Sequence, residues 1–241
     1  MICPASLSQT GSAAPLARRR RAFFTSLVPN TRRIALTGGP GAGKTQACLV
    51  LAAAAPHLFV HVPEAASQVY DLLQTRWDRL DAAGRREVQR QIYRMQLNQE
   101  ATFARSHPDK ILLVDRGSVD GAAYWPDGPD AYWTDLSTSH TAELSRYDAA
   151  IWLQSSAAIG AYDGPVSNPC RFEDPAAAID TGARLQRLWQ PHPRLHCVEA
   201  CRCFDDKLAR IREVLGTIAR RSSPQQILPV YGFDSRDDPA R

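Results

Sequence analysis

The sequence contains no run of about eighteen apolar residues, so it predicts no membrane-spanning helix. It also lacks clustered lysines and arginines outside its first 33 residues, which hold six arginines and no acid. Because the formal net charge is +4, the other residues together carry a formal charge of −2, and no nucleic-acid surface is expected. The six cysteines are scattered through 241 residues, which favours reduced thiols over a disulfide framework.

The length and composition favour one α/β domain with a flexible segment at each end. With 44% hydrophobic residues, 241 residues are enough for one such core. We expect a basic, flexible extension over residues 1–32, a folded domain over residues 33–220 and a flexible tail over residues 221–241. A misassigned start codon or an organelle transit peptide would also explain the arginine-rich, acid-poor extension. The expected location is cytoplasmic, with import into an organelle as the alternative.

Five short β-type runs alternate with longer helical stretches, which is typical of a parallel sheet covered by helices on both faces. The β-type runs lie at residues 33–37, 58–62, 111–115, 149–154 and 194–199. Helices are expected at residues 46–55, 134–146, 175–189 and 205–220. Residues 65–106 would form two helices, or one helix that breaks near Gly84.

Three of the intervening segments have a composition that predicts their role. Residues 65–106 contain a mostly apolar stripe at helical spacing, which we interpret as core rather than as a cofactor site: Gln89, Ile92, Tyr93, Gln96, Leu97 and Gln99, with Phe103 beyond. Residues 121–132 and 162–174 are rich in Gly, Pro, Asp and aromatic side chains, so both are expected to be ordered loops. Ligands of an open α/β sheet bind where such loops gather, beyond the carboxyl ends of the strands.

Residues 34–45 read Ile-Ala-Leu-Thr-Gly-Gly-Pro-Gly-Ala-Gly-Lys-Thr, an apolar run that ends in a glycine-rich turn. Glycines let backbone N–H groups face the phosphates of a nucleotide, and the following helix adds its positive end. Lys44 would bridge the β- and γ-phosphates, and the Thr45 hydroxyl would join the magnesium shell. The alternative is a turn that binds nothing. The residues expected to hold the nucleotide are Gly38, Gly39, Pro40, Gly41, Ala42, Gly43, Lys44, Thr45 and Gln46.

Asp115 ends the third β-type run and is the expected magnesium carboxylate, acting with Thr45 either directly or through water. An aspartate that only caps the next turn would have the same sequence context. Arg116 follows it and would contact a substrate anion or the transferring phosphoryl group, or else form a salt bridge. Asp120 lies a short helical step further on and is a candidate for a second carboxylate in the site.

Two more residues complete the expected catalytic set of Lys44, Glu64, Asp115 and Arg171. Glu64 follows the second β-type run and is a candidate base for a substrate hydroxyl, although an acid that stabilises the start of the next helix is equally consistent. Arg171 precedes the helix expected from Pro175, where a closing lid would bring its charge to the γ-phosphate. A solvent-exposed Arg171 is the alternative.

Several of these motifs together resemble one family. Residues 36–45, 62–66, 114–117 and 120–125 are similar to the NadR/TRPL-translocation-defect group of P-loop AAA-type domains, and the likeness covers about residues 33 to 216. It implies a P-loop NTPase fold of three layers, α/β/α, with a five-stranded parallel sheet in the kinase-like order 2-3-1-4-5. It also implies ATP or GTP, with Mg²⁺, as the ligand.

The resemblance is compatible with two functions, since one branch of the group phosphorylates nicotinamide riboside and another is similar to a trafficking protein that binds GTP and phosphoinositides. We expect a small-molecule kinase that uses ATP and Mg²⁺ on a nucleoside- or nicotinamide-riboside-like acceptor. The alternative is a nucleotide-dependent switch, without kinase activity, that binds a phosphoinositide or a protein partner. The sequence has no Asn-Lys-x-Asp motif for reading guanine, so ATP is the expected nucleotide and GTP the alternative.

Overall fold

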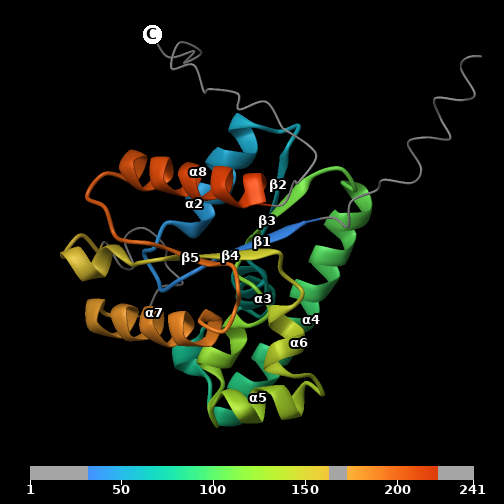
Figure 1. Cartoon of the computed structure of the whole chain (residues 1–241). Helices are drawn as coiled ribbons and strands as arrows, with labels where there is room; N and C mark the ends of the chain where they lie inside the picture. The colour runs from blue at the N-terminus through green and yellow to red at the C-terminus, as the bar shows by residue number, and fades with distance from the viewer. Residues whose placement is uncertain (1–31, 163–172, 222–241) are drawn as a thin grey trace, which may run out of the picture.

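Five parallel strands form the centre of the computed structural model, which describes residues 32–162 and 173–221 (Figure 1). The sheet order is β2-β3-β1-β4-β5, which confirms the predicted α/β/α fold and its strand order. The strands are β1 (Arg33–Thr37), β2 (Phe59–Val62), β3 (Ile111–Asp115), β4 (Ala149–Leu153) and β5 (Leu195–Val198).

The central strand β1 determines where the loops of the site meet. It pairs with β3 on one side and with β4 on the other, and Leu36 lies opposite both Asp115 and Ile151. Because all five strands are parallel, the segments after Thr37, Val62 and Asp115 leave the sheet at the same edge. The strand order reverses at β1, and this is the place where open α/β sheets bind their ligands.

Helices cover both faces of the sheet. In Figure 1, α2 (Lys44–Ala54) and α8 (Phe204–Arg221) lie on one face, and α7 (Pro175–Trp189) lies on the other. The second face also carries α4 (Ala82–Ser106), α5 (Pro129–Asp135) and α6 (His140–Leu144), with α3 (Ala65–Leu73) packed against α4. Alternate residues of β1 point to opposite faces of the sheet. Ile34 belongs to the same core cluster as Ile211 of α8, and Ala35 belongs to the other cluster, with Trp189 of α7. Among the described helices, none is long and apolar enough to cross a membrane.

Residues 65–106 form two helices, one of the two predicted arrangements, but the break comes before Gly84. The segment between α3 and α4 holds a short 3-10 helix, η1 (Trp77–Arg79). Asp81 then caps α4, because its Oδ1 accepts a hydrogen bond of 2.7 Å from the Gly84 N–H. Gly84 therefore lies in the first turn of α4, where a capped N–H compensates for its low helix propensity.

Two other expectations were wrong. The single helix predicted over residues 134–146 is two short helices, since α5 ends at Asp135 and α6 begins at His140. Ser137 between them has a positive φ of 54°, and Ser139 caps α6 by accepting a hydrogen bond from Ala142. The loop predicted over residues 121–132 contains part of the 3-10 helix η2 (Asp120–Tyr124) and the start of α5. Pro129 begins α5 because its fixed φ suits the first turn of a helix.

The expected extension and tail, residues 1–32 and 221–241, fall almost wholly outside the described residues. The one remaining short helix of the described chain is η3 (Ser156–Ile159), directly after β4.

The layer between α8 and the sheet allows a matched test of the core. Ile211 of α8 is fully buried, whereas Ile179 of α7 is 45% exposed. Ile211→Ala is expected to lower the free energy of unfolding by about 2–5 kcal/mol, because it leaves a cavity in a packed layer. Ile179→Ala should change it by less than about 0.5 kcal/mol. Urea unfolding of both variants measures the difference, and equal losses would contradict this packing.

Candidate functional site

The glycine-rich loop between β1 and α2 adopts a backbone that side chains would prevent. Gly41 and Gly43 have positive φ values of 72° and 83°, a region that other residues rarely adopt. A Cβ on Gly39 would lie 2.5 Å from the backbone oxygen of Ala178 in α7. The loop therefore needs glycine for its own turns and for its close contact with α7.

The carbonyl groups of the loop are bonded to the protein. Lys44 Nζ donates to the oxygens of Gly38 (2.8 Å) and Gly39 (3.1 Å). Ser155 Oγ donates to the oxygen of Pro40 (2.5 Å), and the Ser156 N–H donates to that of Gly41 (3.2 Å). With these carbonyls engaged, the N–H side of the loop is left for a ligand, as phosphate binding requires.

Lys207 of α8 holds one more of these carbonyls. Its Nζ donates to the oxygen of Ala42 (3.0 Å) and to that of Gln154 after β4 (2.8 Å). The side chain is buried, and this burial lowers the pKa of Lys207. The sequence analysis missed this residue, although a lysine between Phe204 and Ile211, on the apolar side of a predicted helix, was a usable signal.

Lys44 is buried at the bottom of the site. Burial, followed by the positive charge of Arg116, lowers its pKa to about 8. The negative charges of Asp115 and Glu64 act in the opposite direction. A polyanion bound beside Lys44 would favour the ammonium form, so this lysine suits a phosphate ligand.

Thr45 and Asp115 form a pair that fits a magnesium ion. The Thr45 hydroxyl donates to Asp115 Oδ2 (2.5 Å), while Asp115 Oδ1 is buried and has no hydrogen-bond partner among the described residues. His61 Nε2 lies 3.9 Å from Oδ2. Burial, and then the charge of Glu64, raise the pKa of Asp115 to about 6. A hydroxyl and an incompletely bonded carboxylate are the oxygen donors that Mg²⁺ prefers.

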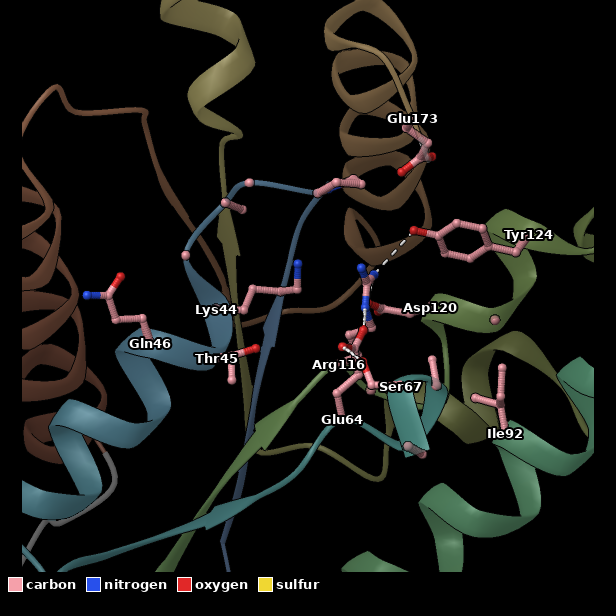
Figure 2. Close-up of a pocket in the computed structure, with 18 of the residues that line it drawn as sticks. Lys44, Thr45, Gln46, Glu64, Ser67, Ile92, Arg116, Asp120, Tyr124 and Glu173 are labelled. Atoms are coloured by element: carbon pink, nitrogen blue, oxygen red, sulfur yellow. Dashed lines mark hydrogen bonds and ion pairs between the residues drawn. The ribbon is translucent and has the colours of Figure 1, made fainter. Parts of the chain in front are cut away.

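Glu64 and Arg116 are in direct contact as an ion pair within the site (Figure 2). Arg116 Nε donates to Glu64 Oε1, and the Ser67 hydroxyl donates to the other carboxylate oxygen (2.7 Å). Burial alone would raise the pKa of Glu64, but the charges of Arg116 and Lys44 outweigh it and lower the pKa. Glu64 is also the N-cap residue of α3, directly before Ala65. Its side chain makes no cap hydrogen bond and is bonded to Arg116 instead.

Asp120 connects three elements below this pair. It accepts hydrogen bonds from the Thr37 hydroxyl of β1 (2.9 and 3.0 Å) and from Trp189 Nε1 of α7 (2.7 Å). Its Oδ2 lies 3.6 Å from Arg116 Nη1. Arg116 has a positive φ of 67°, so its backbone adopts a conformation that is uncommon for a non-glycine residue. In this backbone conformation the Arg116 side chain forms ion pairs with both Glu64 and Asp120.

One cavity of about 670 Å³ connects these groups. Its nucleotide end is lined by loop residues 40–46 and by Ser156, Cys201, Phe204 and Lys207. Its far end is lined by α3, η1, α4, η2 and α5, through Tyr70, Trp77, Gln89, Ile92, Tyr93, Gln96, Tyr124 and Tyr132. Glu64, Arg116 and Asp120 lie along it as well.

The structure thus brings together most of the predicted site residues. Gly38 and Gly39 do not line the cavity, but their carbonyls accept hydrogen bonds from Lys44, which does. Asp115 does not line it either and is hydrogen-bonded to Thr45, which does. Arg171 lies outside the described residues. The core interpretation of the stripe on α4 holds only in part, because Tyr93 and Phe103 pack against a core cluster whereas Gln89, Ile92 and Gln96, with Tyr93, line the cavity.

A glycine-rich loop that joins β1 to α2, in a sheet of this order and opposite a strand-end aspartate, defines a P-loop NTPase domain. The protein therefore belongs to the P-loop nucleotide-binding class. The family model described as an AAA domain matches residues 33–200, and the chain belongs to that family. A search of curated proteins found no match to this sequence.

The buried charge of Asp115 predicts a pH-dependent gain of stability on its removal. The pKa of about 6 in the folded state exceeds the value near 3.9 of an unfolded aspartate. The folded protein therefore binds the Asp115 proton more tightly than the unfolded chain does. This contribution to the free energy of unfolding is fully present below about pH 4 and is lost as the pH rises through 6. Asp115→Asn should raise the free energy of unfolding of the nucleotide-free protein by about 1–3 kcal/mol at pH 7.5, and by less at pH 5.

Thermal and urea unfolding at the two pH values measure this gain, and calorimetry should show that the variant loses Mg²⁺-dependent nucleotide binding. A gain of equal size at pH 5 and pH 7.5 would mean that the carboxylate charge is not its cause.

Lys207 offers a second test of the loop. Lys207→Met removes the donor to Ala42 and Gln154, so we expect nucleotide affinity to fall at least about fivefold as the loop loosens. The control is Lys110→Met, because Lys110 lies in the turn before β3 and does not line the cavity. Titration calorimetry with ATP and Mg²⁺ measures both affinities, and unchanged binding in the Lys207 variant would contradict the role of this bond.

Proposed function

We propose that the protein is a small-molecule kinase that transfers the γ-phosphoryl group of ATP to a hydroxyl group, with Mg²⁺. The observation that carries this proposal is the continuous cavity, which runs from the phosphate loop past Glu64 and Arg116 to an aromatic end. Its volume of about 670 Å³ is in the range of small-molecule sites. A domain that only bound and hydrolysed a nucleotide would not need the second end.

The residues near the loop would hold the nucleotide. The N–H groups of Gly41 and of residues 43–46 and the ammonium of Lys44 would bind its phosphates, and Thr45 and Asp115 would hold the metal. Magnesium bound there supplies positive charge against the charge that develops on the β- and γ-phosphate oxygens. Transfer in such a site depends mostly on positioning and on charge neutralisation.

Glu64 would position the acceptor hydroxyl. Its lowered pKa keeps it ionised at neutral pH, so it would accept a hydrogen bond from the hydroxyl and orient its oxygen toward the γ-phosphorus. A carboxylate of low pKa is a weak base, which suits a reaction with little proton transfer before bond formation. Arg116, already paired with Glu64, would meet the transferring group. The proposed role of Arg171 is to add positive charge from the segment before α7.

The charges of the cavity favour an acceptor without phosphate. Glu64, Asp120 and Glu173 line it together with four described cations, Lys44, Arg116, Arg202 and Lys207, of which Lys44 and Lys207 are bonded to carbonyls of the phosphate loop. Arg116 is engaged with Glu64 and Asp120, so among the described residues near these carboxylates it offers little unpaired positive charge to an anionic head group. A nucleoside-like acceptor, including one like nicotinamide riboside, fits this balance better than a phosphoinositide does. ATP is the proposed nucleotide, with GTP as the alternative.

The test is ADP release from ATP and Mg²⁺ against a panel of nucleosides, nicotinamide riboside and phosphoinositide head groups, with Lys44→Ala as the control. Turnover that needs a nucleoside-like acceptor and disappears in the variant is the expected result. Tight nucleotide binding without turnover on any acceptor would instead support a nucleotide-dependent switch. ADP release that is independent of the acceptor would indicate a simple NTPase.

Glu64→Gln is expected to lower acceptor-dependent kcat at least about tenfold, because the amide positions and polarises the hydroxyl less well than a carboxylate. The affinity for ATP and Mg²⁺ should stay within about twofold, since Glu64 does not belong to the loop. Glu87→Gln on the exposed side of α4 is the matched control. Steady-state kinetics and calorimetry separate the two effects, and an equal loss in both variants would contradict this role of Glu64.

A further inference from the structure

Two glutamines on α4 are the polar groups of a wall that is otherwise mostly apolar and aromatic. Gln89 and Gln96 are 4% and 3% exposed, and both line the far end of the cavity. They are seven residues apart, so they lie on the same helix face about 10 Å from each other along the axis. Tyr93 lies between them on that face and lines the cavity too. Glutamine is seldom buried to this extent without a partner.

The orientation of the Gln96 amide follows from Glu100, one turn further along α4. Gln96 Nε2 donates to Glu100 Oε1 (3.0 Å), and the Tyr147 hydroxyl donates to the same oxygen (2.7 Å). Glu100 Oε2 accepts from Arg146 (3.0 Å) and lies 3.5 Å from Arg33 Nε. Glu100 Oε1 is thus the acceptor of both hydrogen bonds, and Arg146 and Arg33 lie at its other oxygen. The NH₂ group of Gln96 must therefore face Glu100.

This leaves the Gln96 carbonyl oxygen for the cavity. No described residue donates a hydrogen bond to Gln96 Oε1, and this oxygen is not among the fully buried unpaired atoms of the described residues, so it is accessible from the cavity. The Gln89 side chain likewise makes no hydrogen bond within the described ranges, although it is more than nine-tenths buried. The unbonded amide atoms of both residues are therefore open to the cavity, where a ligand of matching polarity would complete their hydrogen bonds.

The remaining lining of this end suits a planar ring. Tyr70, Trp77 and Tyr124 line the cavity beside Tyr93, and Trp77 contacts Tyr124 edge to face with ring centroids 5.9 Å apart. Aromatic side chains in such arrangements offer faces and edges on which a flat heteroaromatic ring packs well. An aliphatic or highly charged acceptor would use neither the rings nor the amides.

We propose that Gln96, oriented by Glu100, determines the specificity of the acceptor end. Its Oε1 accepts a hydrogen bond from an N–H group on a heteroaromatic ring of the acceptor, either a ring amino group or a primary carboxamide. Gln89 binds the next polar group along the ring edge, with either its donor or its acceptor atom. This inference rests on the proposed kinase function, because it assigns the far end of the cavity to the acceptor.

The test measures binding of adenosine, cytidine and nicotinamide riboside to the full chain with Mg²⁺ and a non-hydrolysable ATP analogue. Each is compared with its N,N-dimethyl analogue, which keeps the ring and the ribose but has no N–H donor. At least one parent nucleoside should bind about tenfold or more tightly than its analogue, since the analogue leaves Gln96 Oε1 unpaired. This comparison needs no variant, so it does not depend on the folding of one.

Gln96→Met then removes the amide at nearly constant volume. The preference for the parent nucleoside should fall to about twofold or less in this variant and stay unchanged in Gln91→Met, since Gln91 is on α4 but does not line this cavity. Thermal unfolding and ATP-analogue binding check that both variants fold.

Three results would overturn the inference: no parent nucleoside binds, parent and analogue bind equally, or the preference survives in Gln96→Met. A failure of the kinase proposal looks different, because selective binding would persist without acceptor-dependent ADP release.

Discussion

The site depends on the hydrogen bonds that the carbonyl groups of the phosphate loop accept from the surrounding protein. A loop that presents its N–H groups to a ligand must turn its carbonyls elsewhere, and buried carbonyls need donors. Lys44, Ser155 and Lys207 supply these donors from three different elements. The contact between Gly39 and α7 fixes the other side of the loop. The positions of α7, α8 and the segment after β4 are thus coupled to the backbone shape of the phosphate loop.

The charged groups around the loop are arranged for a ligand rather than for stability. Asp115 is buried with one oxygen unpaired, and Lys44 is buried against the loop with a lowered pKa. Both arrangements cost free energy in the nucleotide-free protein, and a bound metal and polyphosphate would offset that cost. Asp120 differs from them, because Thr37 and Trp189 satisfy its carboxylate and make it a structural connection between β1 and α7.

Sequence patterns predicted the strands and the loop well because their signals are local. Continuous apolar runs indicate buried parallel strands, and Gly-Lys-Thr after such a run indicates a phosphate loop. The error over residues 134–146 arose where short helices depend on caps at Ser139 and Pro129 rather than on a periodic apolar face. The stripe on α4 was assigned correctly only in part, for another reason. Helical spacing shows which side chains share a face, but not whether that face meets a core or a cavity.

The sequence by itself determined the fold class, the strand order through its family resemblance, and the phosphate loop, because short segments carry those signals. Only the tertiary structure decided which distant side chains meet. Lys207 reaches Ala42 across 165 residues, and Glu64 meets Arg116 across 52. Glu100 orients Gln96 only because Arg33, Arg146 and Tyr147 converge on its carboxylate. Such contacts depend on how the layers pack against the sheet, and residue spacing along the chain contains no measure of that packing.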